Sequence, residues 1–384
     1  MPRSLMLGLG MLLLAAGTAA AAQRNADLQM GLTGGYDSNP LELSEGDEAG
    51  LFSQLALEGA LDVEWNHRVS LYGEMAGVAR VYEHEVAGAE YGWADVRAGV
   101  AVVAVRRGQM RFTVAAGGSL GVSRATFIDP ATGEVVLMGP DPNTIVPIPD
   151  RYDYDSRGVF LDLRWRLNAK LLLFLDSQLQ RRAFTESYAE VPTLLQSLDD
   201  VTRTLEPGLR WQVGDRVSID ASAQWSERDY DELAALDQDG LEVAGTRREY
   251  RYTRYRVGVT VDPLSPWDVS VGAEGSGRDD THAGYYDHLG AGAFVSAGYA
   301  LGEKTRFRLH ASQRGVRYDN ALVDSDPDGP RRAGDLTRIV GRAERDLIRQ
   351  LTLTIEAGTS RSDNKDPLYV YDRSWIQTGI RWKL

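Results

Sequence analysis

The segment Val159–Leu167, which reads VFLDLRWRL, decides the fold of this chain. Its odd-numbered positions are apolar or aromatic, whereas the even-numbered Asp162, Arg164 and Arg166 are charged. Alternation with a period of two predicts a β-strand that has one apolar and one polar face. From Leu28 onward no segment keeps a helical period, so we expect an all-β fold. The same alternation recurs most clearly at 217–226, 268–274, 306–312 and 376–384.

The connections between these segments alternate between short and long. Tight links near Asn168 and Gly302 are separated by long polar segments such as 126–153 and 232–246. Short periplasmic turns and long extracellular loops are typical of bacterial outer-membrane barrels. The spacing of the links predicts a transmembrane barrel of about 16 antiparallel strands, an even number that places both ends of the barrel in the periplasm.

The polar face of the strands separates a membrane barrel from a soluble sandwich. In a sandwich the apolar face packs on a second sheet and the polar face meets solvent. In this chain charged residues occupy the polar face of strand after strand, which favours a wet lumen inside and lipid outside. Tryptophans on the apolar parity beside the tight links or the C-terminus predict a periplasmic aromatic girdle. These are Trp65, Trp165, Trp211, Trp267 and Trp382.

The N-terminus predicts export. Arg3 precedes an apolar core from Leu5 to Ala16, and the small residues at 18–22 suit a cleavage site. We therefore expect a signal peptide at residues 1–22 and an outer-membrane barrel at residues 23–384. A membrane anchor is the alternative, and the short apolar core argues against it.

Composition excludes several classes of protein. The 384 residues contain no cysteine, and 42 Lys and Arg against 55 Asp and Glu give a formal net charge of −13. The mean hydropathy of −0.31 excludes a protein with many helical spans. The acidic balance argues against a nucleic-acid partner. Without cysteine there is no Cys-ligated zinc or iron–sulfur cluster, and the five histidines lack metal-ligand spacing, so we expect no metal and no cofactor. Calcium binding by acidic loops such as 231–239 is an alternative.

One sequence motif mimics a hydrolase. Gly117–Gly121 matches G-x-S-x-G, but it lies within a predicted strand with no helix after it, so it cannot form a nucleophile elbow. His310 and Ser312 share one parity among arginines, which a polar pore wall explains. We therefore assign no catalytic residue and do not expect an enzyme.

Arginine dominates the predicted inward parity, and inward acids are fewer. Cross-strand ion pairs that stiffen the wall are one interpretation. A positive excess that favours anionic solutes is the other. We assign as pore-lining residues six arginines expected near the periplasmic end, with three acids close by. They are Arg164, Arg166, Arg254, Arg256, Arg306, Arg308, Asp162, Asp220 and Asp268.

Two further segments have alternative interpretations. In Arg247–Arg256, tyrosines alternate with arginines. Tyr250 and Tyr252 either face the lumen, where they could stack on sugar rings beside Arg254, or belong to an outer aromatic girdle whose arginines reach lipopolysaccharide phosphates, which we favour. The proline-rich segment 126–153 is either a stiff loop that constricts the lumen or a surface loop.

Short elements at both ends of the barrel resemble known outer-membrane families. Gly34–Pro40 reads GGYDSNP and Gly379–Leu384 reads GIRWKL. Together they resemble a group of outer-membrane β-barrel porins associated with exopolysaccharide loci. Tyr36–Asn39 is also similar to the start of the barrel domain in surface lipoprotein assembly modifier proteins, although the same residues are favourable turn formers. The last strand resembles the recognition signal of the barrel-assembly machinery.

The resemblance and the barrel pattern together predict an outer-membrane channel for passage or export of an envelope or extracellular polysaccharide, or of another anionic solute. A general diffusion porin, a surface lipoprotein assembly factor and a closed structural or adhesive barrel are the alternatives. The expected partners are outer-membrane lipid and lipopolysaccharide, the barrel-assembly machinery and periplasmic export components.

Overall fold

The computed structural model describes residues 23–40, 49–83, 91–124, 153–184, 197–264, 266–323 and 328–383. The predicted signal peptide and almost all of the segment 126–153 lie outside these residues. Among the described residues, no helix is long and apolar enough to cross a membrane.

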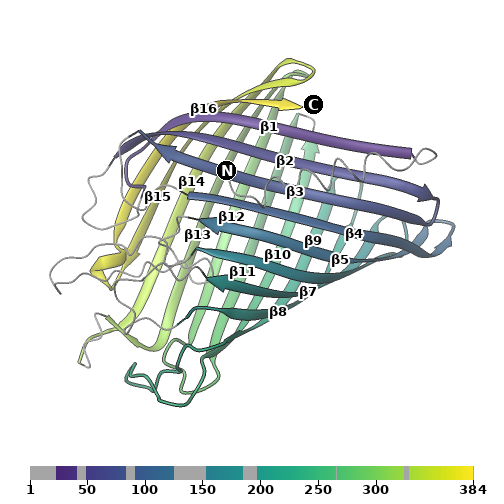
Figure 1. The fold of residues 1–384 in the computed structure, drawn as a ribbon. Helices are drawn as coiled ribbons and strands as arrows, with labels where there is room; N and C mark the ends of the chain where they lie inside the picture. The colour runs from purple at the N-terminus through teal and green to yellow at the C-terminus, as the bar shows by residue number, and fades with distance from the viewer. Residues whose placement is uncertain are drawn as a thin grey trace.

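Sixteen strands of the described residues form one closed barrel (Figure 1). Each strand pairs antiparallel with its neighbours in sequence, and β1 pairs with β16 to close the ring. The predicted fold is confirmed. The strands are β1 (Gln23–Asp37), β2 (Gly50–Asn66), β3 (Val69–Tyr82), β4 (Tyr91–Arg107), β5 (Met110–Arg124), β6 (Tyr154–Arg166), β7 (Leu171–Phe184), β8 (Asp200–Gln212), β9 (Val217–Tyr230), β10 (Glu249–Leu264), β11 (Trp267–Asp280), β12 (His288–Leu301), β13 (Thr305–Leu322), β14 (Arg331–Ile348), β15 (Leu351–Asn364) and β16 (Tyr371–Lys383).

The tight turns share one end of the barrel, which we call the turn end; the other is the loop end. After β6, Asn168 Oδ1 accepts the backbone N–H groups of Lys170 and Leu171 at 2.8 and 2.9 Å. Asn66 binds the turn after β2 in the same way. Gly302, at the turn after β12, has a φ of 66°, a conformation that glycine adopts without steric cost. Asn and Gly at these positions explain why the links are so short.

The strand register determines which side chains face the lumen, because directly paired residues lie on the same face of a sheet. Asp37 is 0% exposed and faces inward, whereas its neighbour Tyr36 is 42% exposed. Large apolar side chains point outward and are exposed, including Leu32 at 63% and Val159 at 57%. The polarity is thus the reverse of a soluble protein, with an apolar exterior and a charged interior.

The closed ring should resist detergent at room temperature. Without boiling, the barrel is expected to migrate on a dodecyl sulfate gel at a different position from the boiled chain, because closure leaves no free strand edge from which unpairing can start. Gel electrophoresis with and without heating measures this, and far-UV circular dichroism should show β structure. A predominantly helical spectrum would contradict the fold.

Candidate functional site

The outer surface has an aromatic boundary at the turn end. The register places four of the predicted girdle residues, Trp165, Trp211, Trp267 and Trp382, on the outward face beside the turns or the end of β16. The fifth, Trp65, lies at an irregularity between Glu64 and Asn66 and is 66% exposed. Trp267 packs against Tyr299 with ring centroids 4.5 Å apart. Nearer the loop end, the outward Trp225 and Tyr255 form an edge-to-face pair at 6.4 Å. Aromatic side chains therefore flank an apolar band, as at the two interfaces of a membrane.

The register places all nine sequence-assigned pore-lining residues on the inward face. Four of the six arginines lie beside turns, on β6 and β13. Arg254 and Arg256 instead lie near the middle of β10, so the prediction that all six share the turn end is wrong for this pair. The reason is strand direction: β10 begins at the loop end, and most of its length separates these two residues from the following turn.

Several of the assigned side chains form ion pairs with inward neighbours. These contacts support the interpretation of a wall stiffened by cross-strand pairs. Because most of the paired side chains are partly exposed to solvent, each pair contributes at most about 1 kcal/mol. The pairs are Arg97–Asp162 at 2.5 Å, Arg210–Asp220 at 2.6 Å, Arg306–Asp346 at 3.1 Å and Arg164–Asp176.

Within the described part of the chain, five inward arginines on β10, β13 and β14 form no ion pair, although Glu274 of β11, the cross-strand partner of Arg256, faces the lumen among them. Arg314 donates only to the hydroxyl of Ser276, at 3.3 Å. We call the surface that these five arginines form the basic face. Its members are Arg254, Arg256, Arg308, Arg314 and Arg338.

Three acidic side chains without ion pairs in the described chain lie on the opposite wall. Glu58 and Asp62 on β2 and Glu74 on β3 face inward, and none forms an ion pair with a basic side chain of the described residues. In the ring of sixteen, β2 and β10 are eight places apart and so lie across the lumen from each other. Glu58 and Arg256 both lie near the middle of their strands. Opposite charges therefore face each other across the lumen.

Flat aromatic rings position several inward arginines. Phe160 covers Gly117, so that a Cβ on this glycine would lie 2.6 Å from the ring. An aromatic ring over a bare glycine fills the space left by the missing side chain. Phe174 covers Gly208 and Phe294 covers Gly272 in the same way. A guanidinium group lies over each of the three rings and is attracted by it, typically by about 0.5–2 kcal/mol. The stacks are Arg97 on Phe160 at 3.6 Å, Arg164 on Phe174 at 5.2 Å and Arg256 on Phe294 at 4.9 Å.

Asp200 organises the inward charges at the loop end of β7 to β9. The carboxylate is 0% exposed. Arg182 donates to it through Nε at 3.1 Å and Nη2 at 3.0 Å, and Arg228 donates through Nε at 3.1 Å. Arg228 is itself only 2% exposed, so two largely buried guanidinium groups share this one buried carboxylate.

Asp37 likewise binds two arginines, at the place where β1 and β16 close the barrel. Arg373 of β16 donates to its carboxylate through Nε at 3.0 Å and Nη2 at 2.6 Å, and Arg80 of β3 lies 3.7 Å away. The Asp37 carboxylate also accepts the backbone N–H of Asn39 at 3.3 Å. The Tyr36–Asn39 element is therefore more than a turn, because its aspartate links the first strand to the last.

Tyr250 and Tyr252 face the lumen, so the favoured interpretation of an outer girdle is wrong. Tyr250 is only 3% exposed because Leu198, Leu233 and Tyr286 pack around it and its neighbours. The connections 231–248 and 281–287 thus fold against this side of the loop end. A sugar in the lumen cannot reach the ring of Tyr250.

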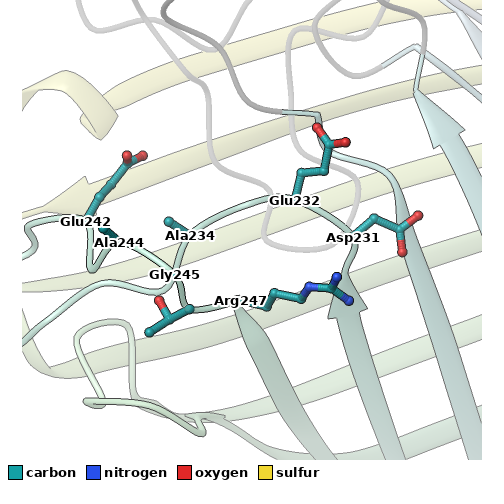
Figure 2. A pocket seen from close by; sticks show the side chains of 8 residues that line it. Asp231, Glu232, Ala234, Glu242, Ala244, Gly245 and Arg247 are labelled. Carbon is teal, nitrogen blue, oxygen red and sulfur yellow. The ribbon is translucent and has the colours of Figure 1, made fainter.

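The connection 231–248 also surrounds an open pocket of about 530 Å³. Figure 2 shows the carboxylates of Asp231, Glu232 and Glu242 together with the guanidinium of Arg247 around it. Among the described residues no cluster of histidine and acidic side chains is arranged to hold a metal ion.

Comparison with known proteins gives matches in structure alone. No family model and no curated protein matches the sequence. The barrel is similar to in-vitro folded OmpT, an outer membrane protein of Vibrio cholerae, with a TM-score of 0.48 and 10% identity over 94% of this chain and 98% of that chain. A triple mutant of the Rhodopseudomonas blastica porin matches with a TM-score of 0.39 and 11% identity over 94% and 100%. These likenesses concern the fold.

The chain forms a barrel of the bacterial outer membrane. A closed sheet with an apolar exterior has no free strand edge, so its backbone hydrogen bonds form between strands without water, which is the condition for spanning lipid with β structure. The even strand number, the antiparallel order and the turn and loop ends agree with outer-membrane barrels.

Two buried groups of the lumen, Asp37 and Asp200, were missed as site residues. A weak sequence signal marks both: three strands reach the loop end with arginine two residues before an aromatic residue. These are Arg80 and Tyr82, Arg182 and Phe184, and Arg228 and Tyr230.

Proposed function

We propose that the barrel is a water-filled channel through which anionic solutes pass along the basic face, with acidic saccharides as the solute class. The observation that carries this proposal is the set of inward arginines on β10 to β14 without ion pairs in the described chain. Barrels of 16 strands leave an aqueous channel. Rings or rows of arginine bias a pore toward anions. Among anionic solutes, polysaccharides are favoured by the resemblance of Gly34–Pro40 to porins of exopolysaccharide loci.

The separation of charge across the lumen predicts which side of the lumen an anion follows. An anion is repelled from Glu58 and Glu74 and attracted toward Arg254 and Arg256, so its path lies against β10 to β14. Acidic side chains on one side of the lumen and basic side chains on the other also orient a solute that carries its charge at one end. Salt should weaken both effects, because the screening length falls from about 10 Å at 0.1 M to about 3 Å at 1 M.

The reversal potential of single channels in planar bilayers tests the proposal. In a KCl gradient the wild-type channel should prefer chloride, and Arg254→Ser/Arg256→Ser should lose most of this preference at low salt. The control is Arg317→Ser/Arg361→Ser, which removes the same charge from the outward face and should leave selectivity unchanged. A cation-selective wild type, or a lumen variant that behaves as wild type, contradicts the proposed selectivity. Absence of any stable open level contradicts the channel and favours the closed barrel.

A further inference from the structure

Toward the loop end, the outward face of β6 to β8 changes from apolar to basic, at the same register position on β6 and β7 and one outward position earlier on β8. On β6, Val159 is the last outward apolar residue before Arg157; on β7, Leu179 precedes Arg181; on β8, Leu205 precedes Arg203 in the direction of the loop end. The apolar residues just below the change are 57%, 45% and 43% exposed, so this surface is open to lipid.

The register brings these arginines together. Arg157 and Arg181 are direct cross-strand partners on the outward face, and Arg203 is the diagonal neighbour of Arg181 on the next strand. Like charges directly opposite each other destabilise a sheet. Arg157 forms no ion pair within the described residues. Two neighbouring guanidinium groups in this arrangement favour binding of an anion between them.

Two carboxylates of the barrel lie near these arginines. Arg181 contacts Asp231 at 2.8 Å, and Arg203 contacts Asp229. The side chains of Arg181 and Arg203 are 48% and 54% exposed, so these pairs are weak and can exchange for a stronger acceptor. Guanidinium groups bind phosphate with two parallel hydrogen bonds, which makes phosphate such an acceptor.

The position of the arginines along the barrel axis indicates which molecule supplies the phosphate. Trp225, which pairs directly with Leu205, belongs to the outward aromatic pair with Tyr255 and marks the interface at the loop end. Arg203 lies one outward position beyond that level, and Arg181 and Arg157 lie two positions beyond it, where the headgroups of the outer leaflet begin. In a bacterial outer membrane this leaflet consists of lipopolysaccharide, whose lipid A carries phosphate groups at this depth.

We propose that Arg157, Arg181 and Arg203 form a binding site for the lipid A phosphates of lipopolysaccharide. This site lies on the outside of the barrel and does not depend on the proposed channel. A lipid A phosphate placed between Arg157 and Arg181 removes their mutual repulsion, so bound lipopolysaccharide should also hold β6 and β7 together.

The test measures binding of diphosphoryl lipid A to the folded, purified barrel in detergent micelles by native mass spectrometry. Arg157→Gln/Arg181→Gln is expected to weaken binding at least tenfold. The control, Arg317→Gln/Arg361→Gln, removes two outward arginines that are paired with Asp335 and Asp372, and should bind as wild type. Heat-dependent gel mobility confirms that each variant is folded.

Further lipids distinguish the source of the anion. Dephosphorylated lipid A and phosphatidylglycerol should bind at least tenfold more weakly than diphosphoryl lipid A, and inorganic phosphate at millimolar concentration should not displace it. The proposal is overturned if wild type does not retain diphosphoryl lipid A, if phosphatidylglycerol binds equally well, or if the two double variants lose binding to the same extent.

Discussion

Replacing Asp200 with asparagine should lower the free energy of unfolding by about 3–5 kcal/mol, because the change removes the buried negative charge that two largely buried guanidinium groups share. Arg182 and Arg228 both donate to Asp200, and Arg228 is only 2% exposed. Asparagine keeps the size of the side chain and removes its charge. Urea unfolding of the barrel in lipid vesicles, followed by tryptophan fluorescence, measures the difference.

Asp220→Asn is the matched control for this prediction. Asp220 also faces the lumen and contacts an arginine, Arg210, at 2.6 Å. The two side chains are 45% and 67% exposed, so water can solvate the arginine that the substitution leaves behind. We expect a loss below about 1 kcal/mol. Equal losses in the two variants would show that the buried position of Asp200 has no energetic consequence.

Gly117→Val should destabilise the barrel by about 1–3 kcal/mol through overpacking of the inner wall. A Cβ at this position would lie 2.0 Å from the carbonyl oxygen of Ala98 and 2.6 Å from the ring of Phe160. The ring must move, and it carries the guanidinium of Arg97 at 3.6 Å. The same urea titration measures the effect.

The adjacent Gly118 provides the control. It faces outward, and a Cβ there would meet only the carbonyl oxygen of Gly158, at 3.6 Å, which is an ordinary contact. Gly118→Val should therefore be close to neutral, because the larger side chain enters lipid and restricts the unfolded chain. If Gly118→Val is as damaging as Gly117→Val, the loss reflects valine in β5 and not the covered glycine.

The sequence was sufficient for the fold and for the face on which each strand residue lies. Alternation along Val159–Leu167 assigns Asp162 and Arg164 to the lumen and Trp165 to the outside, and the register agrees. This succeeds because the period of two is a property of the strand backbone itself and needs no partner. The position of a residue along the barrel axis was harder to predict, as Arg254 and Arg256 show. This position depends on whether the strand begins at the turn end or at the loop end.

Partners inside the lumen depend on contacts between distant parts of the chain. Asp37 and Arg373 are 336 residues apart, and only closure of β1 on β16 brings them together. Arg97 and Asp162, 65 residues apart, also meet only in the folded barrel. The alternating pattern shows that a charge faces inward, but its neutralisation depends on the register and packing of several strands. The tertiary structure therefore separates the paired arginines from the basic face, since side chains from strands far apart in sequence meet only after the sheet has closed.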